Sequence, residues 1–103
     1  MSVDQKKALD NARIYAKLVG EIIQPAKVVL YGSYAKGNWN DNSDIDIAVI
    51  MNTIDDYLET SKKINKLTRG IDTRIEPVLL QSNEDSSGFL STVLNTGITL
   101  YSN

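Results

Sequence analysis

Two short apolar segments and the polar stretch between them constrain the fold of this chain more than any other feature. Residues 27–31 (KVVLY) and 44–51 (DIDIAVIM) are rich in β-branched and apolar side chains, a composition that predicts β-strands. The connection begins with Gly32-Ser33 and ends in a loop-forming stretch, GNWNDNS (37–43). The sequence therefore predicts two strands joined by a Gly-Ser turn, a short helical turn capped by Ser33, and a polar loop.

The rest of the chain alternates between helical and extended patterns. Long helices are predicted over 4–23 and 54–69, and apolar residues should line their inner faces: Ala8, Ala12, Tyr15, Val19 and Ile22 in the first, and Tyr57, Leu58, Ile64 and Leu67 in the second. A third strand (73–80), a short helix (89–95) and a final strand (98–101) follow. We therefore expect a single α+β domain over 1–103, with helices packed on a small mixed sheet.

Composition excludes several classes of site. The chain has no Cys and no His, which excludes thiol nucleophiles, His-based triads and the usual zinc sites. A general base must be a carboxylate, Lys or Tyr, and a metal must be a hard ion such as Mg²⁺ or Mn²⁺. The net charge of −2 argues against direct binding to nucleic acid. With no membrane span, signal peptide or cysteine in the sequence, we expect a cytoplasmic protein.

The Gly32-Ser33 turn is a candidate phosphate site. A strand that ends in Gly and enters a helix at Ser presents free backbone N–H groups, and Gly lets a phosphate approach closely. The Ser33 hydroxyl adds a donor, and Lys36 adds positive charge one turn later. Taken alone, the dipeptide is explained more simply as a tight turn with a helix cap.

Asp44 and Asp46 are candidate metal ligands. Side chains alternate across a strand, so both carboxylates should lie on one face. Two carboxylates this close repel each other, and a divalent cation removes the difficulty because both attract it. The alternative is a pair of solvated aspartates at an exposed strand end.

A third acid could complete such a site. Asp72, Arg74 and Glu76 should share one face of the third strand. We prefer Glu76, which we expect to be buried within an apolar run, over Asp72, which we expect to be solvated at the strand's start. Arg74 could bind phosphate or pair with either acid. Pro77 cannot donate to a strand ladder, which places this strand at an edge or at a bulge.

The combined spacing resembles a known signature. A strand, Gly-Ser, ten residues and then Asp-x-Asp in a second strand resemble the DNA polymerase β-like nucleotidyltransferase superfamily. More narrowly, GSYAKGNWNDNSDID is similar to the GSxA(R/K)Gxxxx(S/T)DxD motif of minimal nucleotidyltransferase domains, and the terminal GITLY is similar to their ending. The resemblance covers the chain from about Val28 and implies the polymerase β-like fold.

The resemblance also implies a role for each candidate residue. Gly32 and Ser33 would hold the triphosphate of ATP or another nucleoside triphosphate, and Asp44 and Asp46 would hold Mg²⁺. Glu76 would complete the metal site and deprotonate an acceptor hydroxyl, although this position is usually aspartate in the family. The reaction would be in-line attack of the acceptor on the α-phosphorus, with release of pyrophosphate.

Minimal domains of this family often act as antitoxins. The resemblance implies a HEPN-domain toxin as partner, typically an RNase, silenced by AMP transfer to a tyrosine. The alternative is a non-catalytic nucleotide-binding module that neutralises its partner by masking. We expect Trp39 to anchor its loop or contact a partner rather than stack on a base. The nucleotide, the acceptor and any homo-oligomer are left open.

Overall fold

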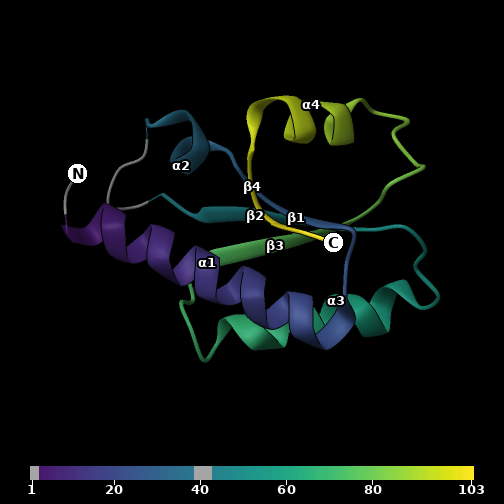
Figure 1. Cartoon of the computed structure of the whole chain (residues 1–103), viewed down its shortest axis with the longest axis horizontal. Helices are drawn as coiled ribbons and strands as arrows, with labels where there is room; N and C mark the ends of the chain where they lie inside the picture. The colour runs from purple at the N-terminus through teal and green to yellow at the C-terminus, as the bar shows by residue number, and fades with distance from the viewer. Residues whose placement is uncertain (1–2, 39–42) are drawn as a thin grey trace.

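A computed structural model describes residues 3–38 and 43–103. The elements follow one another in this order: α1 (Val3–Ile23), β1 (Lys27–Tyr31), α2 (Ser33–Lys36), β2 (Ile45–Met51), α3 (Tyr57–Thr68), β3 (Ile75–Gln81), α4 (Phe89–Thr96) and β4 (Ile98–Ser102). Figure 1 shows the sheet in the middle of the molecule, with α4 on one side and α1 and α3 on the other. The predicted α+β architecture is confirmed. Within the described ranges, every helix is too short or too polar to cross a membrane.

The sheet is mixed and has the strand order β3-β2-β1-β4. β1 pairs antiparallel with both β2 and β4, whereas β2 pairs parallel with β3. Because α3 connects β2 to β3, these three elements form a β-α-β unit. β3 lies at an edge of the sheet, one of the two placements that Pro77 allowed.

The alternation of side chains along the central strands divides the apolar core in two. On the α1 and α3 side, Ile45, Ile47 and Val49 of β2 contact the buried residues of α1. On the α4 side, a smaller cluster joins the sheet to α4: Val29, Ala48, Ile50, Leu90 and Val93. Asp46 has the same parity as Ala48 and Ile50, so its side chain belongs to the α4 side.

A buried tyrosine ties the two long helices together. The Tyr15 ring of α1 is fully buried, and its hydroxyl donates a hydrogen bond of 2.7 Å to the backbone carbonyl of Ile64 in α3. Burial raises the pKa of this hydroxyl far above its usual value. The contact holds α1 and α3 in register beneath the sheet.

Both long helices are confirmed, but three predicted core residues are exposed. Ile22 is 49% exposed, Tyr57 56% and Leu58 64%. All three lie in a terminal turn of their helix, where fewer neighbouring elements are available to cover a side chain. The four other predicted positions of α1 and the central Ile64 of α3 are fully buried, as expected.

Candidate active site

A row of polar side chains crosses the three strands β1, β2 and β3. In the antiparallel pairing Tyr31 lies opposite Asp46, and in the parallel pairing Asp46 lies beside Glu76. Paired residues on adjacent strands point to the same face of a sheet. Tyr31, Asp46 and Glu76 therefore form one cross-strand row on the α4 side of the sheet.

Asp46 is the centre of a negative field. Its carboxyl group is partly buried, and its pKa is raised first by burial and then by the negative charges of Glu76 and Asp44. The pKa of the Tyr31 hydroxyl is raised as well, by burial, Asp46 and Glu76 in that order. A cation bound beside Asp46 would favour its ionised form.

Asp44 and Glu76 both act on Asp46, but neither is buried. Asp44 lies immediately before β2 and is exposed. Glu76 is also exposed, so the expectation that it would be buried inside the third strand is wrong. The physical reason is that β3 is an edge strand with no neighbour on one side. Glu76 nevertheless lies next to Asp46, the position expected of a third acid.

The Gly32 turn packs directly against Asp46. Gly32 has φ +74°, a left-handed conformation that L side chains rarely adopt. A Cβ atom built on Gly32 would overlap the Asp46 carboxylate. The turn expected to bind phosphate and the carboxylate expected to bind metal are therefore in contact.

The N-cap of the short helix α2 lies one residue before the predicted one. Gly32 is the N-cap and Ser33 is the first helical residue, so the prediction of Ser33 as the N-cap is wrong. Ser33 is half-buried, and Lys36 is exposed in the last turn of α2. The N–H groups of a first helical turn have no partner within the helix, and the Ser33 N–H is at this end of α2, directly after the turn that packs on Asp46.

Asp72, the other candidate third acid, is committed to a different contact. Arg74 donates to both carboxylate oxygens of Asp72, from Nε to Oδ1 at 3.1 Å and from Nη2 to Oδ2 at 2.8 Å. Asn11 of α1 donates a further bond of 3.1 Å. These bonds lower the pKa of Asp72 to about 2, the Arg74 side chain being the largest cause.

This contact reverses two predictions. The Asp72 side chain is only 9% exposed, whereas we expected a solvated acid. Asp72 and Arg74 also do not share a face with Glu76, because both precede β3 and Asp72 is held by α1. Arg74 was expected either to bind phosphate or to pair with an acid, and in the structure it forms an ion pair with Asp72.

Two aromatic residues near the row were not singled out by the sequence. Tyr31 is a member of the row, and Phe89, the first residue of α4, packs edge-on against it with ring centroids 5.5 Å apart. The signal for Tyr31 was its place next to Gly32, but only the strand register puts it opposite Asp46. Tyr34 is buried in the larger core cluster and is structural. Trp39 lies outside the described residues.

The acids of the row, together with Asp44 just before β2, suit a hard divalent cation by their chemistry. Across residues 3–38 and 43–103, no three acidic side chains converge as a ready-made metal site. Asp44, Asp46 and Glu76 still offer only oxygen donors, the ligands that Mg²⁺ prefers. Because Asp44 and Glu76 are exposed, their side chains are free to turn toward a cation beside Asp46.

Known proteins are similar to this chain over most of its length. A family model described as "Polymerase beta, Nucleotidyltransferase" matches residues 15–103. A protein of Methanocaldococcus jannaschii, MJ0604, named as a proposed protein adenylyltransferase, is 32% identical over 77 residues, which are 73% of this chain and 77% of that protein.

Two solved structures have a similar fold. A chain in the crystal structure of a toxin–antitoxin with AMP-PNP superimposes with a TM-score of 0.67 at 28% identity, over 91% of this chain and 74% of that chain. A chain of the toxin–antitoxin MntA-HpeT, in a mutant form, gives a TM-score of 0.67 at 24% identity, over 89% and 73% respectively. The second likeness concerns the fold alone.

Proposed function

Because the chain belongs to the polymerase beta nucleotidyltransferase family, we propose that it transfers AMP from ATP to a hydroxyl group of a partner toxin and so acts as an antitoxin. The observation that carries the proposal is the contact between the Gly32 turn and Asp46, with Glu76 in register beside it. The name of the relative MJ0604 supports adenylyl transfer to a protein. The similar chain from a toxin–antitoxin with AMP-PNP supports a toxin partner and an adenine nucleotide.

In the proposed site, different residues would bind the triphosphate and the metal ion. The N–H groups and the hydroxyl at Ser33 would bind the triphosphate, and Gly32 leaves room for its close approach. Lys36 would add positive charge from the end of α2. Asp44, Asp46 and Glu76 would hold Mg²⁺, which when bound neutralises phosphate charge and aligns the reactants.

The proposed transfer is an in-line displacement at phosphorus. The acceptor oxygen attacks the α-phosphorus in line with the bond to the β-phosphate, that bond breaks, and pyrophosphate leaves. Glu76 takes the proton of the acceptor hydroxyl, since the chain has no histidine and Asp72 is already bound by Arg74. We propose a tyrosine of a HEPN-domain toxin as the acceptor.

A transfer assay with the partner tests this proposal. The chain is incubated with ATP labelled at the α-phosphate, Mg²⁺ and, as the candidate toxin, the protein encoded by the neighbouring gene. We expect label on the toxin, with the mass increase of one AMP on a tyrosine. Asp46→Asn should abolish the transfer, while Asp55→Asn, a change of an exposed acid in the loop after β2, should leave it intact.

The same assay separates transfer from masking. If the toxin were neutralised without acquiring label, and Asp46→Asn neutralised it equally well, the chain would be a binding module. Label on another residue type would keep the transferase and change the acceptor.

A further inference from the structure

A groove runs between α1 and α3 on the side of these helices that faces away from the sheet. It has a volume of about 530 Å³ and is lined by Leu18, Ile22, Lys63, Lys66, Leu67 and Ile71, with Gly70 at its edge. An adjoining hollow of about 370 Å³ shares Leu18 and Ile71 and extends the apolar surface to Ile14. Ile22 in the groove is 49% exposed and Ile14 in the adjoining hollow is 55% exposed, so each of the two hollows has a large apolar side chain without full cover.

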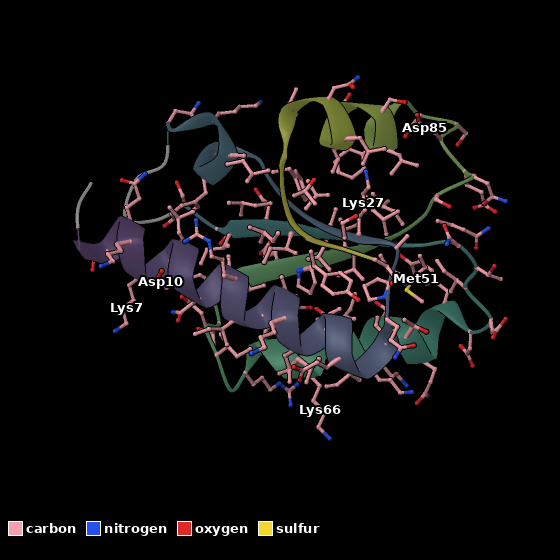
Figure 2. The ribbon with its side chains drawn as sticks, in the orientation of Figure 1. Lys7, Asp10, Lys27, Met51, Lys66 and Asp85 are labelled. Atoms are coloured by element: carbon pink, nitrogen blue, oxygen red, sulfur yellow. The ribbon has the colours of Figure 1, made fainter. Side chains whose placement is uncertain are left out.

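The rim of the groove is basic. Lys63 and Lys66 border the main groove and Lys17 borders the adjoining hollow, where Glu21 is the only acid among the lining residues. Across the described residues, the ion pairs are Arg13 with Asp10 and Arg74 with Asp72, so none of these lysines is in one. Figure 2 shows Lys66 pointing away from the sheet into open space. In a chain with net charge −2, this is a local surface for an acidic partner.

The shape of the groove suits a helix. Figure 1 shows α1 and α3 side by side and running in opposite directions, and the seam between two packed helices can seat a third. An amphipathic helix places apolar side chains on one stripe and polar ones on its flanks. We propose that this groove binds an amphipathic helix of a partner protein, whose apolar stripe covers Ile14, Leu18 and Ile22 and whose flanking Asp or Glu residues face the lysines.

Other occupants fit less well. A second copy of the chain seated groove to groove would bring two lysine rims together, which is unfavourable. A nucleic acid backbone would meet the lysines but has no use for an apolar floor. The cross-strand row lies on the opposite side of the sheet, so a helix in the groove would leave Asp46 open. The groove is therefore a surface that tethers a partner. This role does not depend on the proposed transfer.

An NMR titration of the full chain with defined probes tests the groove. The probes are a helical peptide of about five turns with a leucine stripe and glutamate flanks, the same peptide with lysine flanks, and phosphatidylglycerol vesicles. We expect the acidic peptide to shift backbone amides of residues 14–22 and 63–71 saturably. The basic peptide should bind at least about tenfold more weakly.

Variants sharpen the test. Ile22→Ser should weaken binding of the acidic peptide at least about tenfold. Leu94→Ser should not, because Leu94 is a similarly exposed apolar residue of α4 on the other side of the sheet. Lys63→Glu with Lys66→Glu should reverse the preference toward the basic peptide, with the melting temperature of each variant checking its fold. Equal binding of both peptides, tighter binding of vesicles, or self-association through the groove would each overturn the proposal.

Discussion

Gly32 forms the turn that packs against the Asp46 carboxylate and that we propose binds phosphate. Its φ of +74° makes any L side chain costly, and an added Cβ would overlap Asp46. We predict that Gly32→Ala lowers the free energy of unfolding by about 2–4 kcal/mol, because overpacking adds to the backbone cost. Transfer should fall at least about 100-fold because Asp46 is displaced.

Gly37 provides a matched control for this change. It also has a left-handed φ, +80°, but a Cβ there meets nothing within 4 Å. Gly37→Ala should therefore lower the free energy of unfolding only by the backbone cost, about 1–2 kcal/mol. Chemical denaturation of both variants measures the difference, and equal losses would contradict the packing of Asp46 on the turn.

Asp46 and Asp72 should respond to pH in opposite directions. The pKa of Asp72 falls from 3.8 to about 2 on folding, so its contribution to stability is present above pH 4 and is lost between about pH 4 and pH 2. The pKa of Asp46 is raised, so its ionisation opposes folding as the pH rises through that raised pKa, and the penalty is absent below the unfolded pKa of 3.8.

Asparagine substitutions separate the two effects. At pH 7, Asp72→Asn should lower the free energy of unfolding by about 1–2 kcal/mol, a value reduced for solvent screening at the one-third exposed Arg74. Asp46→Asn should raise the free energy of unfolding at pH 7. Urea unfolding from pH 2 to pH 8 should show both differences shrinking in acid, and a stabilising Asp72→Asn would contradict the ion pair.

The third acid is tested by comparing Glu76→Gln with Asp72→Asn in transfer. Glu76 lies beside Asp46 in the register, whereas Asp72 is bound by Arg74 and Asn11. We predict a loss of about 100-fold or more for Glu76→Gln, in the range of a missing general base. Asp72→Asn should cost far less once its lower stability is allowed for, and the reverse ranking would move the role to Asp72.

At the scale of elements, a buried hydrogen bond adds to the apolar packing of α1 on α3. Tyr15→Phe removes the hydroxyl that donates to the Ile64 carbonyl and leaves the ring in place. We predict a loss of about 1–2 kcal/mol in the free energy of unfolding. Tyr101→Phe is the control. Tyr101 is half-buried on β4, and the change removes its hydroxyl without removing any hydrogen bond seen among the described residues. Equal effects of the two changes would contradict a special role for Tyr15.

The elements themselves were predictable because their signals are local. The helical stripe through Ala8, Ala12 and Tyr15 and the β-branched run after Asp46 each lie within one segment of chain. The burial of Asp72 was not predictable, because it depends on Asn11, which is 61 residues away. The exposure of Glu76 depends on its strand being uncovered, and the place of Tyr31 opposite Asp46 depends on register. These are properties of the assembled sheet.

At the scale of the whole molecule, the open site predicts dependence on a partner. Asp44 and Glu76 are exposed, and positioning of the acceptor supplies most of the acceleration in this kind of transfer. The chain alone with ATP and Mg²⁺ should release pyrophosphate negligibly, and addition of the cognate toxin should raise the rate by at least about 1,000-fold. Rapid turnover on a small free acceptor such as an aminoglycoside, measured by pyrophosphate release, would identify a stand-alone transferase instead.

The two-sided core of β2 has a consequence for how this chain can evolve. The odd-numbered positions of the strand pack on the side of α1 and α3: Ile45, Ile47 and Val49. The even-numbered positions face the α4 side, beginning with Asp46 and followed by Ala48 and Ile50. Ala48 and Ile50 are buried against α4, so within β2 only Asp46 is spared a place in the apolar core. A change at Asp46 alone could therefore end the proposed chemistry and leave both apolar clusters intact, so that a lineage could lose the transfer and keep the scaffold for another use.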